Sequence, residues 1–273
     1  MKTPRSFLLK KTRKTASVAS APPKGLASFL PPWRRAAEPF ALSVITALAL
    51  SGSLVANQEA GTIVSVAAST DSDLTANPDS PFWKPVKGVI VRQDKMGHPV
   101  SKDVMTVRSR WTESNLYLLF ICVFDSLYMK PGPNTIEETN HLWNWDVAEA
   151  FIGDDFQNIN RYKEFEVSPQ GEWVDLDIDR GNLGGSPEAW RWNSGFKVKA
   201  RIDHARNVWY AEMRIPMQSV SRKPAAPGLQ LRINFFRTQG TGPARLALAW
   251  QPTHAATFHV PSAFGVLQLA PLH

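Results

Sequence analysis

Hydrophobic and polar residues alternate with a period of two in many short stretches from about residue 70 to the C-terminus, and no long stretch with the helical period interrupts them. The stretch 115–124, NLYLLFICVF, is hydrophobic on both faces, which predicts a buried central strand. Turn residues between neighbouring stretches predict two hairpins, one joining 162–167 to 172–178 and one joining 196–202 to 208–215. Further strands are expected over 146–152, 229–237, 245–250 and 264–269.

This series of short strands without a helix-bearing crossover predicts an all-β fold, specifically an antiparallel two-sheet β-sandwich or jelly roll. We expect one domain over residues 70–273, with a linker rich in Ser, Pro and Ala over 69–81. A chain of 273 residues has room for one such domain and an N-terminal extension.

The first 60 residues have a different character from the rest. Arg34 and Arg35 precede an uncharged run from 39 to 57 whose hydrophobic part is followed by small residues, the pattern of a secretory signal peptide. We therefore expect residues 1–60 to be a basic leader with a signal peptide, which directs the domain to the periplasm or out of the cell. The alternative is an uncleaved membrane anchor with the domain facing outside, because the run is close to the ~20 residues that span a bilayer.

The formal net charge of +7 comes from this N-terminal part. Of the 31 basic and 24 acidic residues in the chain, residues 1–60 contain nine and two, so the remainder carries 22 of each. A neutral domain argues against binding to the phosphates of a nucleic acid. The single cysteine, Cys122, excludes an internal disulfide, and its place in the most hydrophobic strand predicts inert packing rather than catalysis.

Acidic residues are the first candidates for chemistry. Glu164 and Glu166 share one face of a predicted strand, so the sequence leaves open a glycoside hydrolase in which this pair acts on one glycosidic bond. Asp175, Asp177 and Asp179 also share a face and leave open a calcium site, although the turn glycine and the final glutamate of a calcium loop are missing. No cofactor is required by the sequence.

A non-covalent haem is a second alternative. Two histidines five residues apart and two methionines four residues apart could supply axial ligands. They are His254, His259, Met213 and Met217. A covalent haem of the usual kind is excluded because the chain has no C-x-x-C-H motif.

Tryptophan is abundant, with ten residues in the chain. Trp143 and Trp145 lie in a polar stretch just before a predicted strand that contains Glu149. Exposed indole rings in such a place indicate a binding surface. The apolar face of a sugar ring stacks on an indole, and nearby carboxylates accept hydrogen bonds from the sugar hydroxyls. A glycan partner and plain packing of these tryptophans in the core or at the rim both remain open from the residues alone, and we do not expect the protein itself to be an enzyme.

Six segments, in this order, resemble the family 9 carbohydrate-binding modules and their DOMON-like relatives. They extend over most of the predicted domain, from about residue 79 to 269. They are Asp79–Trp83, Asn115–Asp125, Trp143–Ile152, Phe165–Gly171, Trp209–Pro216 and Leu248–Thr253 with Phe258–Gly265.

The resemblance implies a β-sandwich in which two aromatic rings clamp a sugar while polar side chains contact its hydroxyls. Trp143 falls on one clamp position and Phe258 on the other, where the family has Trp. Glu149 falls on an acid that contacts hydroxyls, and Glu166 replaces an arginine with that role. Arg237 is a candidate to substitute for the lost arginine, and Trp145 lies beside the clamp. Such modules accompany glycoside hydrolases, so a role in assisting polysaccharide degradation is expected.

Overall fold

The computed structural model describes residues 61–181 and 189–272. The expected leader, signal peptide or anchor over residues 1–60 lies outside the described residues. Among the residues that the structure describes, no helix combines the length and the hydrophobicity needed to cross a bilayer.

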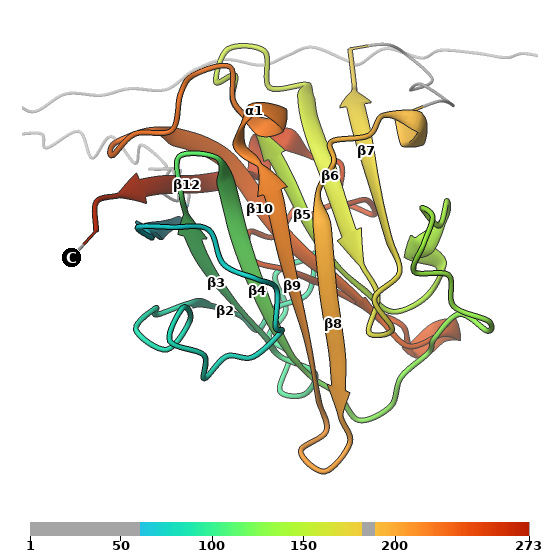
Figure 1. Ribbon diagram of the computed structural model, residues 1–273. Helices are drawn as coiled ribbons and strands as arrows, with labels where there is room; N and C mark the ends of the chain where they lie inside the picture. Colours follow the sequence, from blue (N-terminus) through green and yellow to red (C-terminus); the bar gives the residue numbers. More distant parts are fainter. Residues whose placement is uncertain (1–60, 182–188, 273) are drawn as a thin grey trace, which may run out of the picture. The chain divides into compact units, whose positions relative to one another are not determined.

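The described chain is almost entirely β-structure (Figure 1). Its single α-helix in these residues, α1, is the short segment Met217–Val220. The strands are β1 (Thr62–Ala67), β2 (Val89–Val91), β3 (Met105–Trp111), β4 (Asn115–Val123), β5 (Val147–Gly153), β6 (Arg161–Val167), β7 (Trp173–Asp179), β8 (Lys197–Asp203), β9 (Val208–Pro216), β10 (Gln230–Gln239), β11 (Leu246–Ala249) and β12 (Gly265–Ala270). The 3-10 turns are η1 (Leu142–Asn144), η2 (Ala189–Arg191), η3 (Gly242–Ala244) and η4 (Pro261–Ala263).

The predicted all-β class is confirmed, but the antiparallel two-sheet arrangement is not. The strands form one mixed sheet in the order β7-β6-β5-β10-β12-β1-β3-β4-β9-β8, with β11 paired to β10 and β2 to β3. Strand β1 is parallel to both of its neighbours, β12 and β3, and so connects two otherwise antiparallel halves. Because β1 lies before residue 70, the predicted start of the domain, the pattern of strands after that point gave no sign of this connection.

The two halves of the sheet face each other across the main hydrophobic core. Figure 1 shows β3, β4, β9 and β8 side by side, with β5, β6 and β7 in the neighbouring layer. The core contains Phe120 of β4, Met213 of β9, Phe165 of β6 and Phe235 of β10. Strand β4 is buried along most of its length, as its uninterrupted hydrophobic sequence predicts. The core is therefore enclosed by one continuous mixed sheet and not by two separate antiparallel sheets.

Both predicted hairpins are present. Strand β6 pairs with β7 in antiparallel register, and β8 pairs with β9 in the same way. The β8–β9 turn contains Asn207 in the left-handed region at φ 53°, a conformation that asparagine tolerates.

Cross-strand register divides β5, β6 and β10 into two faces. Ala148 of β5 pairs with Val167 of β6 and Arg237 of β10, and these side chains lie on the face of the main core. Glu149 pairs with Glu166 of β6 and Phe236 of β10 on the opposite face, because successive side chains of a strand alternate between faces. This second face carries the candidate site.

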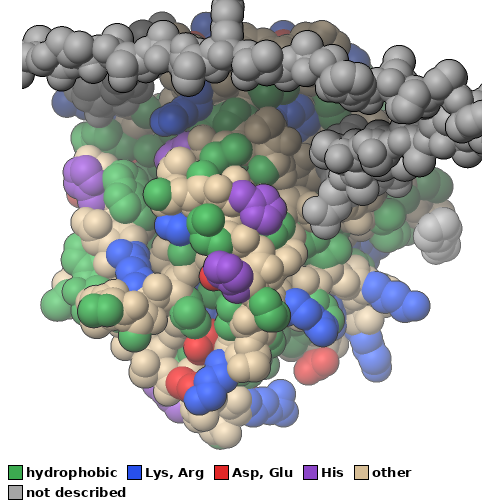
Figure 2. Space-filling model, turned by 180° about the vertical axis from the view of Figure 1, so that it is seen from behind, with side chains coloured by type: hydrophobic (Ala, Val, Ile, Leu, Met, Phe, Trp, Pro, Cys, Tyr) green, Lys and Arg blue, Asp and Glu red, His purple; other side chains and the backbone are tan. Residues whose placement is uncertain are grey.

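The surface of the domain mixes residue types. On the face shown in Figure 2, basic side chains are scattered among hydrophobic and polar ones rather than gathered into one band.

Candidate functional site

A pocket of about 410 Å³ lies over the second face of β5, β6 and β10. Its volume is within the ~300–1,000 Å³ of typical small-molecule sites. Residues far apart in the sequence meet there, including Trp143 from η1, Glu149 and Phe151 from β5, Glu164 from β6, Thr238 from β10, Arg245 beside β11, and Phe258 and His259 from the loop before η4.

Trp143 forms one aromatic wall of the pocket. It is half-buried and packs against the small hydrophobic cluster that includes Leu142 and Val147. His141, two residues before Trp143, has a left-handed backbone at φ 63°. Its ring packs edge-on against the Trp143 indole, with the ring centroids 4.9 Å apart. The guanidinium of Arg245 donates hydrogen bonds to the carbonyl oxygens of Trp143 and Trp145. The loop that presents the indole is therefore held from both sides.

Phe258 lines the same pocket from a different part of the chain. Its ring stacks on Phe236 of β10, with centroids 4.3 Å apart and an angle of 14° between the planes. The Lys95 ammonium lies 5.9 Å from the centre of the Phe258 ring. The ring is half-buried and supported from the sheet, so it forms a second apolar wall.

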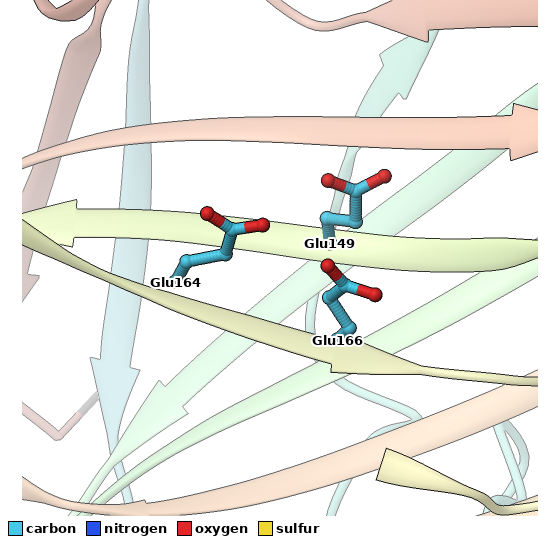
Figure 3. Close-up of side chains that lie close together, drawn as sticks. All are labelled: Glu149, Glu164 and Glu166. Carbon is cyan, nitrogen blue, oxygen red and sulfur yellow. The ribbon is translucent and has the colours of Figure 1, made fainter. Parts of the chain in front are cut away.

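The floor of the pocket contains a group of three carboxyl side chains from Glu149, Glu164 and Glu166 (Figure 3). One oxygen from each lies within 4.8 Å of the others, and the residues are 2%, 4% and 0% exposed. Glu149 and Glu164 line the pocket, whereas Glu166 lies behind them as the cross-strand partner of Glu149.

Burial dominates the electrostatics of this group. It raises the pKa of Glu164 to about 7. The pKa values of Glu149 and Glu166 are raised well above their ordinary range by burial and then by neighbouring glutamate charges, while the charge of Arg245 acts in the opposite direction. Raised carboxyl pKa values gathered in one pocket are typical of functional sites.

His259 completes the polar side of the pocket. Its Nδ1 atom is 2.7 Å from the Tyr162 hydroxyl, and its Nε2 atom is 4.0 Å from a carboxyl oxygen of Glu164. Burial, with a smaller contribution from the charge of Arg180, lowers the pKa of His259 to about 4. The imidazole is therefore neutral at neutral pH and available as a hydrogen-bonding group.

The structure thus brings four of the predicted site residues together, namely Trp143, Phe258, Glu149 and Glu166. Trp145 is half-buried and does not line this pocket. Arg237 is placed on the core face, where it is fully buried, donates hydrogen bonds to the carbonyl oxygens of Asp103 and Val123, and lies over the Trp209 ring. It cannot reach the pocket floor from that face.

Arg245 is the site residue that the sequence did not reveal. It is the first residue of the strand expected over 245–250, where no charge pattern distinguishes it, and the structure places it between η3 and β11. Its role follows only from the tertiary contact with the carbonyl oxygens of the loop at Trp143.

The other candidates for chemistry lie elsewhere. The three aspartates of β7 have separate partners, since Asp175 accepts hydrogen bonds from Ser194, Asp177 pairs with Lys163, and Asp179 pairs with Arg161. They do not form the group expected of a calcium site. Burial raises the pKa of the Cys122 thiol to about 12, as expected of an inert core cysteine.

The candidate haem ligands do not share a pocket in the described part of the chain. Met213 and Met217 are buried in the main core. His259 lines the pocket described above, whereas the His254 ring lies 2.9 Å from the carbonyl oxygen of Met96 and borders a different depression. No pair of these residues faces a common space that would hold a haem.

Comparisons with known proteins agree with this architecture. The family model described as carbohydrate family 9 binding domain-like matches residues 80–271. A family 9 carbohydrate-binding module from Caldicellulosiruptor kristjanssonii, solved with glucose, aligns with a TM-score of 0.57 at 15% identity and covers 78% of this chain and 97% of its own. The same kind of module solved with cellotriose aligns with a TM-score of 0.55 at 15% identity, over 78% of this chain and 95% of its own.

A sequence relative is also known from a fungus. An extracellular protein of Arthroderma benhamiae is 28% identical over 171 residues, which is 58% of this chain and 75% of that protein. Because the family model matches well over half of the sequence, this chain belongs to the carbohydrate family 9 binding domain-like family.

Proposed function

We propose that this protein binds a carbohydrate in the pocket between Trp143 and Phe258, and that it does so outside the cytoplasm. The observation that carries the proposal is the meeting of these two half-buried rings over a floor of carboxyl groups. The glucose and cellotriose bound by structurally similar modules support a glucan-type ligand.

The physical basis is the two-sided character of a sugar ring. Its C–H groups pack against the electron-rich face of an indole, and Trp143 offers such a face. Its hydroxyls need hydrogen-bond partners once they leave water, and Glu149, Glu164 and the neutral His259 line the same pocket. Thr238 adds a further hydroxyl at the rim.

A larger depression of about 950 Å³ lies elsewhere, bordered by residues such as Asp154, Lys163 and Trp192. We favour the smaller pocket because two aromatic walls and unpartnered polar groups meet there.

The proposed biological role is to hold a polysaccharide or oligosaccharide for a separate degrading enzyme. The pair Glu164 and Glu166 is not suited to hydrolysis, because the two carboxyl groups of a glycosidase flank the sugar. Glu164 lines the pocket, but Glu166 lies behind Glu149 and does not.

A glycan array with the purified protein tests the proposal, followed by calorimetric titration of the best ligand. We expect binding to soluble glucan or xylan oligosaccharides, and weaker or no binding by the variant Trp143→Ala. The absence of binding to any glycan on the array would contradict the proposal. Release of reducing sugar that is lost in the variant Glu164→Gln would instead favour a hydrolase.

A further inference from the structure

When ionised, the three glutamates at the pocket floor carry more negative charge than their surroundings balance. Both carboxyl oxygens of Glu166 are buried without a hydrogen-bond partner, as are one oxygen of Glu149 and one of Glu164. Figure 3 shows the three carboxyl groups gathered together above strands β5 and β6. Unpaired carboxylates are costly in a dry environment, so this arrangement requires an explanation.

Nearby basic side chains do not balance the charge of the three glutamates. In the described ranges, neither Lys nor Arg forms an ion pair with any of the three glutamates. Arg245, whose charge acts on Glu149 and Glu166, uses its Nη2 atom to donate to the carbonyl oxygens of Trp143 and Trp145. His259 lies 4.0 Å from Glu164 and is neutral near pH 7.

We propose that Glu149, Glu164 and Glu166 bind one divalent cation, with calcium as the preferred ion, at the floor of the pocket. Calcium is held by carboxylate oxygens at about 2.3–2.6 Å, so two ligand atoms on opposite sides of the ion are roughly 5 Å apart. The three oxygens lie within 4.8 Å of one another, which allows a single ion to contact all of them. The fully buried, unpartnered carboxyl group of Glu166 points into this group.

Calcium fits these ligands better than magnesium. It accepts six to eight oxygens in flexible geometry, whereas magnesium demands near-octahedral geometry and retains several waters. Three carboxylates fixed on two rigid strands provide oxygen ligands of the kind calcium takes, but not a complete octahedron. The divalent charge offsets most of the negative charge that the described surroundings leave unbalanced.

The ion has a second consequence, which rests on the proposed function. Glu149 and Glu164 line the pocket, so the remaining coordination positions of the ion face the space for the sugar. Two neighbouring hydroxyls of a sugar are suitable ligands for these positions. In this arrangement the cation contacts the sugar hydroxyls directly. The Glu166 carboxylate cannot replace the family's arginine in that role, because it has no hydrogen to donate.

Calorimetric titration of the full-length protein with CaCl₂, after treatment with EDTA and its removal, tests the site without any sugar. We expect one calcium ion to bind, with a higher melting temperature in its presence and weaker binding of MgCl₂. The variant Glu166→Gln should bind calcium at least tenfold more weakly and lose the shift in melting temperature. Its unliganded fold should be as stable as the wild type or more so, because a buried charge is removed.

A matched control is Glu138→Gln. Glu138 also lies beside another carboxyl group, that of Asp175, but outside the group of three. Calcium binding should be unchanged in this control. Absence of calcium binding by the wild type, or equal binding by Glu166→Gln, would overturn the inference. Sugar titrations with and without calcium are a separate arm, so a protein that binds calcium but no sugar would contradict only the proposed function.

Discussion

Glu149 of β5 and Glu166 of β6 are direct cross-strand partners, and both side chains are buried on the face of the sheet that carries the pocket. Like charges placed opposite each other across a ladder destabilise a sheet. The pairing therefore opposes folding and makes sense only where a ligand or bound protons reduce the repulsion. This pairing indicates that the face of β5 and β6 that carries the two glutamates serves a function beyond stabilising the fold.

The first prediction concerns the indole wall. Trp143→Ala removes the stacking surface, and we expect sugar affinity to fall by about 1–3 kcal/mol, which is roughly fivefold to more than a hundredfold in Kd. The fold should be retained, because Trp143 packs at the edge of a small cluster rather than in the main core. Calorimetric titration with an oligosaccharide measures the change.

The neighbouring tryptophan offers a matched comparison. Trp145 is half-buried, two residues further along, and does not line the pocket. Trp145→Ala should leave Kd within about twofold of the wild-type value. An equal loss of affinity in the two variants would contradict the assignment of the wall to Trp143.

The second prediction concerns Phe258. Its ring rests on Phe236, so Phe258→Ala removes the pocket wall without opening the main core. We expect affinity to fall by about 1 kcal/mol, roughly fivefold in Kd, as for the loss of a single aromatic contact. Phe258→Tyr retains the ring and serves as the control in the same titration. Unchanged binding in Phe258→Ala would show that the sugar does not contact this side of the pocket.

The third prediction separates charge from geometry at Arg245. Lysine retains the positive charge felt by Glu149 and Glu166 but lacks the rigid, planar guanidinium whose Nη2 atom donates to both carbonyl oxygens. We expect Arg245→Lys to loosen the loop at Trp143 and to weaken sugar binding several-fold. Hydrogen exchange at residues 143–145 should accelerate in the variant. If Arg245→Lys matched the wild type in both measurements, the planar guanidinium would have no role.

The fourth prediction is a dependence of stability on pH. Burial, followed by the charge of Asp175, raises the pKa of Glu138 from its ordinary value of 4.5 to about 8. The folded state thus holds this proton more tightly than the unfolded state. The resulting stabilisation is complete below about pH 4.5 and is lost as the pH rises through 8. Melting temperatures of the wild type across this interval should fall more steeply than those of Glu138→Gln. Parallel curves for the two proteins would refute this prediction.

The fifth prediction concerns a buried acid with a structural role. The Glu212 carboxylate accepts hydrogen bonds from the backbone N–H groups of Thr75 and Ala76, at 2.8 and 2.7 Å, and from the Trp83 indole at 2.8 Å. Glu212→Gln replaces one acceptor oxygen with a donor that faces other donors. We expect the free energy of unfolding to fall by about 1–3 kcal/mol in urea titrations, with sugar affinity unchanged. An unaltered free energy of unfolding would show that these hydrogen bonds contribute little.

Much of the fold could be predicted because the alternation of residues reports directly on which face of a strand is buried. The hairpins β6–β7 and β8–β9 followed from turn residues between alternating stretches. Strands β1, β2 and β3 were not predicted. Strand β3 contains Arg108 and Arg110, which look like solvent-facing residues but donate hydrogen bonds to backbone carbonyls of the segment that contains Trp83. The continuity of the sheet through β1 depends on long-range pairing that local patterns do not encode.

The site was predictable where a residue type pointed to chemistry and not where tertiary contacts decide the role. The two aromatic rings and Glu149 could be selected from the sequence with the help of the family resemblance. Arg237 could not be distinguished from Arg245 without knowing that register places Arg237 on the core face. The shared face of Glu164 and Glu166 was evident from spacing, but their burial beside Glu149 required the pairing of β5 with β6.

The most direct test of the central claim is a crystal structure of the protein with a bound oligosaccharide, such as cellotriose. We expect a sugar ring between the side chains of Trp143 and Phe258, with its hydroxyls directed to the floor that contains Glu149 and Glu164. A sugar bound instead in the depression beside Asp154 and Trp192, with the pocket at Trp143 left unaltered, would contradict it.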